Sequence, residues 1–424
     1  MITADSSTRP GPRGLLVSSV VARIPAAMLS LALLVHAQRL TGSYAVAGLV
    51  TGAYGAAVGL GGPLLGRLAD RRGHLGVLAL GGIATALQLA VLAVLPAAVP
   101  AVVLVALAAG IGLTRPPVGA CLRATLPSLV AGPARERRVY AIEATATELT
   151  FIAGPTLALA VAGVWSTRVA LGGAGVVLLL ATVLFALQTT RALASTCPTG
   201  DRGGVDGPRS FAGSLASPTI VALIMLLGGV GVAFGAVEVS TAAAATHLGA
   251  SAAAAPLLSV WAVGSLLGGL VTARIGAERL SLGGVVIALA VGHAACALGA
   301  GSVVLLGVLI LLAGATIAPT YAVVYALAGE VAPAGTATEA FAWLATAVAV
   351  GTAGGSALAG SMVDQAGPAA GFLVAGIGGA MAVTVVLGRA GTLGTKTANR
   401  RGTAAPRRCR NGRFSVRHPG TGTG

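Results

Sequence analysis

The chain has 424 residues, of which 56% are hydrophobic and only 9% are charged, and its mean hydropathy is +0.91. A soluble globular domain carries about 25% charged residues, so this composition excludes a soluble globular fold and indicates a polytopic membrane protein. The formal net charge of +15 does not indicate nucleic-acid binding, because the basic residues lie in short connections and in the C-terminal tail.

Apolar runs that are long enough to cross a bilayer recur along the chain. A membrane-spanning helix needs about 20 mainly apolar residues, and by this measure the sequence predicts twelve spans and an all-α membrane protein. In chain order the predicted spans are 14–37, 45–67, 75–95, 99–126, 138–163, 169–190, 218–245, 252–273, 281–300, 302–328, 337–362 and 368–388.

The longest internal polar stretch, residues 191–217, divides the predicted spans six and six. It is rich in Gly and Pro, which disfavour helix, so we expect a flexible connector. The predicted organisation is an N-terminal six-helix bundle (1–190), a cytoplasmic central loop (191–217), a C-terminal six-helix bundle (218–388) and a basic, disordered cytoplasmic tail (389–424).

Basic residues gather on one side of the predicted spans. With both termini in the cytoplasm, the outer connections hold only Arg39 and Arg168, while Arg23, Arg115 and Arg123 lie within spans. All the other Lys and Arg residues then lie on the inner side, as the positive-inside rule requires. The sequence therefore predicts a multi-pass plasma-membrane protein with both termini in the cytoplasm.

The two halves of the sequence correspond to each other in several short segments. Ala69-Asp70-Arg71 corresponds to Ala277-Glu278-Arg279, and Leu107–Gly110 corresponds to Leu311–Gly314, in the same order along each half. This order indicates duplication of a six-helix unit. Such a repeat is typical of transporters whose halves rock about a central site.

The connection between the second and third spans contains the run Gly66-Arg-Leu-Ala-Asp70-Arg71-Arg-Gly73. This run resembles the loop signature of the major facilitator superfamily, although His74 and Leu75 replace the usual basic pair. With the six-plus-six division, the resemblance covers the chain except for its tail. It implies a secondary transporter of two six-helix bundles, similar to the proton-coupled drug and metabolite efflux branch.

Gly66, Asp70, Arg71 and Gly73 are therefore the candidate gating residues. Gly66 allows two helices to cross closely, Gly73 allows a tight turn, and Asp70 is an anion suited to a helix N-terminus. The resemblance implies that Asp70 latches the two halves at the start of the eleventh span, which begins with the capping-box pattern Thr336–Glu339. The alternative is an Arg-rich loop that only marks topology.

Two further segments are similar to motifs of proton-coupled members of this family. The segment Arg115–Gly119 in the fourth span has Val118 where the family has glutamine. The pair Gly154-Pro155 in the fifth span, a predicted helix kink, lacks the paired glycines that follow it in proton-antiporting exporters. The resemblance implies proton coupling and slightly favours export over import.

Charged side chains inside a membrane are costly unless they are paired or hydrated. Depths counted at about 1.5 Å per residue place Arg123 and Glu143 at the same level, as a predicted structural ion pair. Glu148 lies deeper, and we expect Arg115 or Arg23 as its partner. The candidates for proton coupling in the cavity are Arg23, Arg115, Glu148 and Glu238.

These features predict a secondary active transporter that exports a small, lipophilic or cationic molecule by proton antiport through alternating access. Two alternatives stay open: a sugar or metabolite permease of the same superfamily, working as a uniporter or proton symporter, and a non-transporting membrane receptor. The sequence contains no nucleotide-binding loop, metal-ligand spacing or Ser/His arrangement, so we expect no enzyme activity, metal or cofactor. We expect a monomer whose partners are a small-molecule substrate, protons and the lipid bilayer, without nucleic acid.

The variant Glu148→Gln tests the predicted proton carrier. A carboxylate in the membrane can take up and release a proton, whereas the isosteric amide cannot. We expect this variant to lose transport driven by a proton gradient while it still reaches the membrane. Full gradient-driven transport by Glu148→Gln would contradict the carrier role.

Overall fold

The computed structural model describes residues 12–96, 99–130, 132–196, 213–276 and 279–388, and these residues are almost entirely helical. The first half contains seven helices, which are α1 (Pro12–Thr41), α2 (Tyr44–Arg72), α3 (His74–Val94), α4 (Ala101–Thr114), α5 (Val118–Leu129), α6 (Pro133–Val164) and α7 (Thr167–Thr196). The second half contains α8 (Pro218–His247), α9 (Ala254–Ile275), α10 (Leu282–Ala295), α11 (Val303–Gly314), α12 (Ile317–Val331), α13 (Ala337–Ala366) and α14 (Pro368–Gly388), with short 3₁₀ turns η2 (Gly213–Ala216), η3 (Ser251–Ala253) and η5 (Cys296–Gly299).

Within the described part of the chain, eleven of the twelve predicted membrane spans coincide with helices that are long and apolar enough to cross a membrane, and the predicted span 138–163 is not among them. This agreement confirms an all-α membrane protein. The predicted span 138–163 lies within α6, a helix of 32 residues. At the sixth span the prediction ended too early, because α7 continues to Thr196, inside the predicted central loop.

Two of the predicted spans are each built from two helices. The fourth consists of α4 and α5, and the helix is interrupted at residues 115–117, where Pro116 and Pro117 follow Arg115. Proline has no N–H to donate and disfavours helical backbone in the residue before it. The tenth consists of α11 and α12, interrupted at residues 315–316.

Both interrupted spans pack through a glycine against a neighbouring helix of the same half. A Cβ on Gly112 of α4 would collide with the backbone of α2 at the Tyr54 carbonyl. A Cβ on Gly314 of α11 would collide in the same way with the backbone of α9 at the Trp261 carbonyl. Each half thus has a close glycine crossing beside an aromatic residue, although the sequence comparison matched Gly314 with Gly110 and not with Gly112.

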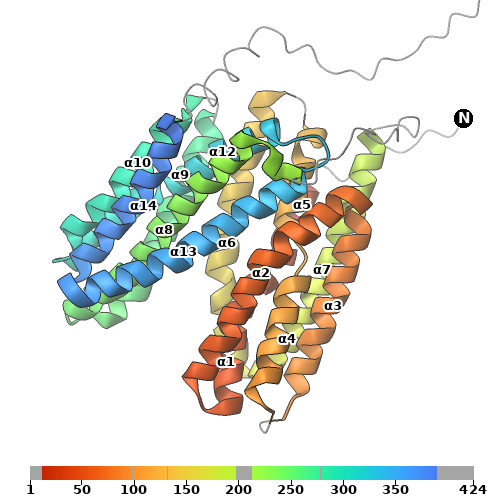
Figure 1. The fold of residues 1–424 in the computed structure, drawn as a ribbon, viewed down its shortest axis with the longest axis horizontal. Coiled ribbons are helices and arrows are strands. Elements are labelled where there is room, and N and C mark those ends of the chain that lie inside the picture. The colour runs from red at the N-terminus through yellow and green to blue at the C-terminus, as the bar shows by residue number, and fades with distance from the viewer. Residues whose placement is uncertain (1–11, 97–98, 131, 197–212, 277–278, 389–424) are drawn as a thin grey trace, which may run out of the picture.

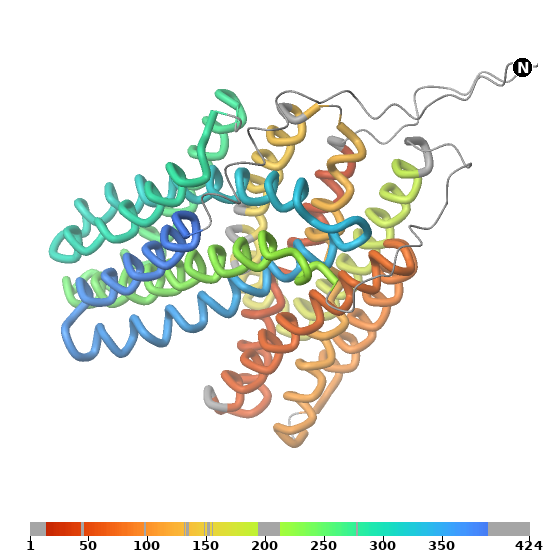
Figure 2. The backbone as a smooth tube through the Cα atoms, turned by 45° about the horizontal axis from the view of Figure 1, so that its top comes forward, coloured from red at the N-terminus to blue at the C-terminus, as the bar shows by residue number. Residues whose placement is uncertain are grey.

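The helices form two groups that meet at one end of the molecule and diverge toward the other (Figure 1), and the turned view in Figure 2 shows the same divergence. The first group is α1–α7 and the second is α8–α14. We call the region where the groups meet the Asp70 end, after the residue at the end of α2. The contacts between the groups are made chiefly by α2 with α13 and by α6 with α9 and α12.

Large apolar side chains cover the outside of the helices. Leu298 and Val304 are each 77% exposed, and Val94 is 75% exposed. The interior contains many alanines and glycines, which allow the helix backbones to approach closely. This arrangement is the one expected of a protein whose outer surface faces lipid.

The contact of α13 with α8 supplies a test of helix packing. A Cβ on Gly355 would overlap the Val232 carbonyl of α8, whereas a Cβ on the neighbouring Gly354 would meet nothing within 4 Å. Overpacking of a close contact costs about 1–3 kcal/mol. We expect Gly355→Ala to lower the temperature at which detergent-purified protein loses its monodisperse elution peak, and Gly354→Ala to leave it unchanged. Equal melting temperatures of the two variants would contradict a close crossing of α13 and α8 at Gly355.

Candidate functional site

The carboxylate of Asp70 caps the N-terminus of α13, which belongs to the other helix group. Its Oδ1 accepts a hydrogen bond from the backbone N–H of Thr338 (3.1 Å), and its Oδ2 accepts one from that of Glu339 (2.9 Å). The first N–H groups of a helix have no partner within the helix and carry a partial positive charge. Asp70 therefore holds the two groups together through both a helix cap and a charge–dipole contact.

Two glycines, one before and one after Asp70 in the chain, allow Asp70 to reach the start of α13. At Gly66 a Cβ would lie 3.0 Å from the Thr338 carbonyl oxygen and 3.2 Å from the Glu339 Cα, so the absence of a side chain lets α2 reach α13. Gly73 has a φ of 88° and separates α2 from α3. Arg71, the remaining gating candidate, is exposed and forms no hydrogen bond or ion pair that the structure records.

The predicted capping box at Thr336–Glu339 is not formed. Thr336 is the N-cap residue, but its side chain makes no cap hydrogen bond and donates instead to the Pro333 carbonyl (2.9 Å). The Glu339 carboxylate points to Arg67 of α2, with 4.0 Å between Nε and Oε2. The reason is that Asp70 already occupies the N–H groups that a local cap would use.

Glu339 also contacts the segment that leads into α8. A Cβ on Gly213, the first residue of η2, would collide with the Glu339 carboxylate, and Gly213 has a φ of 57°. Two acids at one helix start would repel each other, and Arg67 supplies the opposite charge beside Glu339. His74 adds a further contact, since its Nε2 lies 3.2 Å from the Thr338 hydroxyl.

A second set of contacts joins the groups between α6 and α12. Arg137 and Glu330 lie 3.6 Å apart as an ion pair. One turn further along α6, Tyr140 is fully buried; its hydroxyl donates to the Arg123 carbonyl (2.9 Å) and lies where a Cβ on Gly329 would collide with it. These residues join α6 of the first group to α12 of the second.

Deeper in the molecule, Arg23, Arg123 and Glu143 form the arginine–glutamate cluster. Arg123 of α5 holds the Glu143 carboxylate of α6 with Nε (3.0 Å) and Nη2 (3.1 Å). Arg23 of α1 donates from Nη1 to the same carboxylate (2.8 Å) and to the hydroxyl of Thr147 (2.8 Å). Glu143 is completely buried.

The cluster brings some of the predicted charged residues together and leaves others apart. Arg123 and Glu143 form the ion pair expected from their depth, and Arg23, one of the two arginines expected beside Glu148, also bonds to Glu143. Arg115 is half-buried at the break between α4 and α5 and makes no ion pair within the described residues. Glu238 is exposed on α8, and the structure records no bond from it to a described residue.

Three predicted positions lie on α6 near the cluster. The side chains of Glu148 and Pro155 lie outside the described residues. The helix continues without a break through Gly154 and Pro155. Gly154 is buried, and a Cβ there would collide with Ala27 of α1. In the structure Gly154 is therefore a crossing point of α6 on α1.

Aromatic side chains of the second group continue from the cluster. The Arg123 guanidinium lies 4.1 Å from the centre of the Tyr325 ring on α12, a cation–π contact. Tyr321 lies 5.2 Å from Tyr325, and Phe234 of α8 lies 6.3 Å from Tyr321, centre to centre. Tyr321 and Tyr325 are four residues apart on α12 and therefore share one helix face, a spacing that is visible in the sequence.

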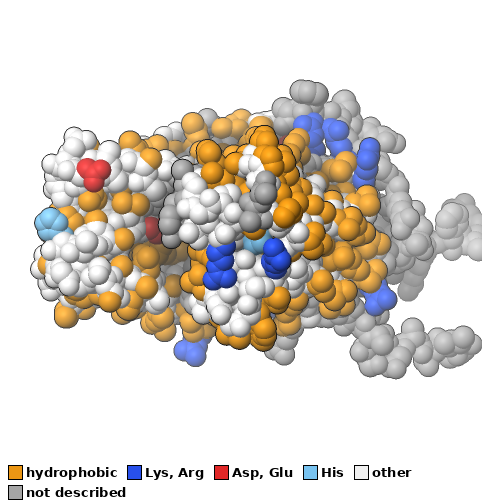
Figure 3. Space-filling model, turned by 90° about the horizontal axis from the view of Figure 1, so that it is seen from below, with side chains coloured by type: hydrophobic (Ala, Val, Ile, Leu, Met, Phe, Trp, Pro, Cys, Tyr) orange, Lys and Arg blue, Asp and Glu red, His pale blue; other side chains and the backbone are white. Residues whose placement is uncertain are grey.

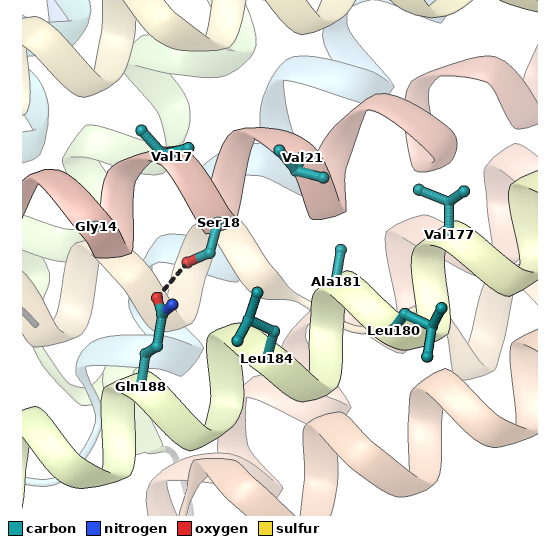
Figure 4. A pocket seen from close by; sticks show the side chains of 9 residues that line it. All are labelled: Gly14, Val17, Ser18, Val21, Val177, Leu180, Ala181, Leu184 and Gln188. Carbon is teal, nitrogen blue, oxygen red and sulfur yellow. Dashed lines mark hydrogen bonds between the residues drawn. The ribbon is translucent and has the colours of Figure 1, made fainter.

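Seen from the end at which the two helix groups diverge, the surface of the molecule has a hollow between the groups (Figure 3). A separate groove of about 630 Å³ lies between α1 and α7, and it is lined by Gly14, Val17, Ser18, Val21, Val177, Leu180, Ala181, Leu184 and Gln188 (Figure 4). Ser18 donates to Gln188 there (2.8 Å). Val21 and Arg23 are two residues apart, about 200° around a helix, so this groove does not face the cluster.

The described residues contain no group of three His, Cys, Asp or Glu side chains that could hold a metal ion. The charged side chains at the site are the arginines, the glutamates and Asp70. These groups can bind ions, take part in proton transfer and hold helix ends.

The chain is similar to known proteins in sequence pattern and in fold. A family model described as Major Facilitator Superfamily matches residues 15–268, and a comparison with curated proteins finds no match. A bacterial homologue of the iron transporter ferroportin, in its outward-facing state, is 16% identical, with a TM-score of 0.71 over 90% of this chain and 99% of that one.

Two other solved structures are similar over nearly their whole length. The proton:xylose symporter XylE is 13% identical, with a TM-score of 0.69 over 89% of this chain and 95% of that one. The human organic anion transporter MFSD10 (TETRAN) is 16% identical, with a TM-score of 0.67 over 90% of this chain and 100% of that one. At these identities the likeness shows the fold.

The Asp70 cap supplies a test of how the groups are held together. Asparagine at position 70 keeps one acceptor oxygen but turns an amide toward the second N–H, and loss of a charged cap costs about 1–2 kcal/mol. We expect Asp70→Asn to increase the population open at the Asp70 end about five- to thirtyfold. Spin labels at the exposed positions Arg72 and Ala334, with the native cysteines replaced by alanine, measure the distance between the groups.

The control is Asp364→Asn, which makes the same chemical change at an exposed position near the other end of α13. It should leave the distance distribution of the parent protein unchanged. A distribution for Asp70→Asn identical to that of the parent would contradict a role of the cap in closure.

Proposed function

The chain belongs to the major facilitator superfamily and is a secondary transporter rather than an enzyme, and we propose that it exports a small molecule by proton antiport. In this proposal the two helix groups are the moving domains. They give the substrate site access to one side of the membrane at a time. The observation that carries the proposal is the Asp70 cap, which joins the groups at one end while they diverge at the other.

The cap is suited to repeated opening because water can replace it. The N–H groups of Thr338 and Glu339 and the carboxylate of Asp70 all lie at helix ends, where water reaches them once the groups part. Backbone groups within the helices stay bonded in both states. The conformations that are closed and open at the Asp70 end then differ by only a few polar contacts. A bound solute can therefore shift the equilibrium between them.

The Asp70 end faces the cytoplasm in this proposal. Arg67, Arg71 and Arg72 flank Asp70, and basic connections favour the cytoplasmic side. On this orientation the structure is closed to the cytoplasm and open outward, as in the similar ferroportin homologue described as outward-facing. The protein would act in the plasma membrane as a monomer, with both termini inside.

Proton coupling is assigned to carboxylates within the membrane. Glu148 is the proposed carrier, and Glu238, exposed on α8, is the second candidate. Glu143 lies between two arginines, which stabilise its charged form, so we assign it a structural role. Export of drug-like molecules rests on the weaker motif around Gly154-Pro155.

A permease that moves a sugar or metabolite together with protons is the second candidate. It is favoured by the similar fold of a proton:xylose symporter and of a fucose:proton symporter with 13% identity and a TM-score of 0.63. The two candidates differ in the direction in which a proton gradient drives the solute.

Transport into everted membrane vesicles separates these functions. A panel of cations, neutral lipophilic compounds, sugars and carboxylates is added to the vesicles with and without a pH gradient in which the vesicle interior is acidic. Vesicles without the protein are the control. We expect gradient-dependent accumulation of at least one compound, abolished by a protonophore. Accumulation unaffected by the protonophore would contradict antiport, and proton-driven movement in the opposite direction would favour the permease. Ligand binding without any movement would favour a receptor.

A further inference from the structure

One edge of the Arg23 guanidinium has no partner. Nη1 makes both hydrogen bonds of this side chain, to Glu143 and Thr147. Nε and Nη2 are buried, and neither has a hydrogen-bond partner in the described structure. Buried donors without an acceptor are unfavourable, so this edge marks a place where an acceptor is missing.

The free edge has the geometry that binds a carboxylate. Arg123 uses the same two atoms, Nε and Nη2, to hold both oxygens of Glu143 at 3.0 and 3.1 Å. A guanidinium presents these two N–H groups in parallel, which matches the two oxygens of a carboxylate. The neighbouring arginine thus shows, in the same cluster, the contact that Arg23 can make with a second carboxylate.

The charges of the cluster favour the same ligand. Arg23 and Arg123 carry two positive charges and Glu143 carries one negative charge, so the three side chains have a net charge of about +1. A buried net charge is costly in a membrane protein. A solute with one negative charge would neutralise the cluster, whereas a cation would be repelled by it.

Arg23 is the least buried member of the cluster, although its Nε and Nη2 are themselves covered in this conformation. Its side chain is 12% exposed, more than that of Arg123 (7%) or Glu143 (0%). Across the interface, Tyr321 and Phe234 are half-buried and continue the aromatic series that starts at Tyr325. Through Tyr325, which contacts Arg123, this aromatic series connects the cluster to the second helix group.

We propose that Nε and Nη2 of Arg23 bind the carboxylate of a small monocarboxylate substrate, whose apolar body lies toward Tyr321 and Phe234. Arg123 and Glu143 are positioning residues, because they hold Arg23 and leave its second edge free. The substrate would then bridge the two helix groups. This inference rests on the proposed transport function and names its substrate class as anionic.

Binding is measured first, on purified full-length protein in lipid nanodiscs, as stabilisation against heat. The probes are acetate, benzoate and octanoate, each compared with the amide of the same shape. We expect at least one carboxylate to raise the melting temperature, with a rise that grows with the logarithm of its concentration above Kd, while its amide does not. If no carboxylate stabilises the protein more than its amide does, the proposal is overturned.

Variants at position 23 then assign the binding to the free edge. Arg23→Gln leaves Arg123 and Glu143 as a neutral pair, so we expect it to fold and to weaken carboxylate binding about 10- to 100-fold. Arg23→Lys keeps the positive charge but lacks the two parallel N–H donors, so it should weaken carboxylate binding less than Arg23→Gln does. The control Arg168→Gln removes one positive charge at an exposed position and should bind as the parent does. Equal affinity of Arg23→Gln and Arg168→Gln would overturn the assignment.

Transport of the bound carboxylate in proteoliposomes separates this inference from the proposed function. Binding that depends on Arg23, without movement driven by a pH gradient, would refute proton antiport and support the carboxylate site. Gradient-driven transport of a cation or a neutral compound, without carboxylate binding, would support the proposed function and refute the carboxylate site.

Discussion

The first backbone N–H groups of α13 have no partner within their own helix, and the closed end of the protein depends on how they are satisfied. Asp70 supplies the acceptors from the other helix group. The cap therefore exists only while the groups are together, unlike a local cap, which would persist in every conformation. This makes the start of α13 a contact whose stability is tied to the conformational state of the transporter.

The packing within each group differs from the packing between the groups. Inside the second group, the glycines of α8 and α13 allow backbone to meet backbone, as at Gly231 and Gly355. At the α2–α13 interface, a Cβ on Gly59 would lie 3.6 Å from Thr346 and one on Gly62 would lie 4.0 Å from Ala342, both ordinary contact distances. Along these two helices the close approach between the groups is instead at Gly66, beside the Asp70 cap, where a Cβ would lie 3.0 Å from the Thr338 carbonyl oxygen.

The arginine–glutamate cluster places buried charge close to the interface between the groups. Its three charged members come from α1, α5 and α6 of the first group, while Tyr325 of the second group lies against Arg123. A solute that binds Arg23 would thus act on the first group directly and on the second through the aromatic series. The cluster and the Asp70 cap lie on the same two helix groups, so occupation of one can change the balance at the other.

The sequence by itself determined that the chain consists of apolar helices, that α2 carries an acid in its last turn, and that Arg123 and Glu143 lie at one depth. These features depend on hydrophobic runs, on local backbone preferences and on a rise per residue that every helix shares. The tertiary structure decided how each helix is rotated and which helix stands beside it. It placed Arg23 on Glu143, put Asp70 where a local capping box was expected, and made Gly154 a crossing point on α1. Depth along a helix can be counted from residue numbers, but the direction of a side chain toward another helix depends on the packing of all its neighbours.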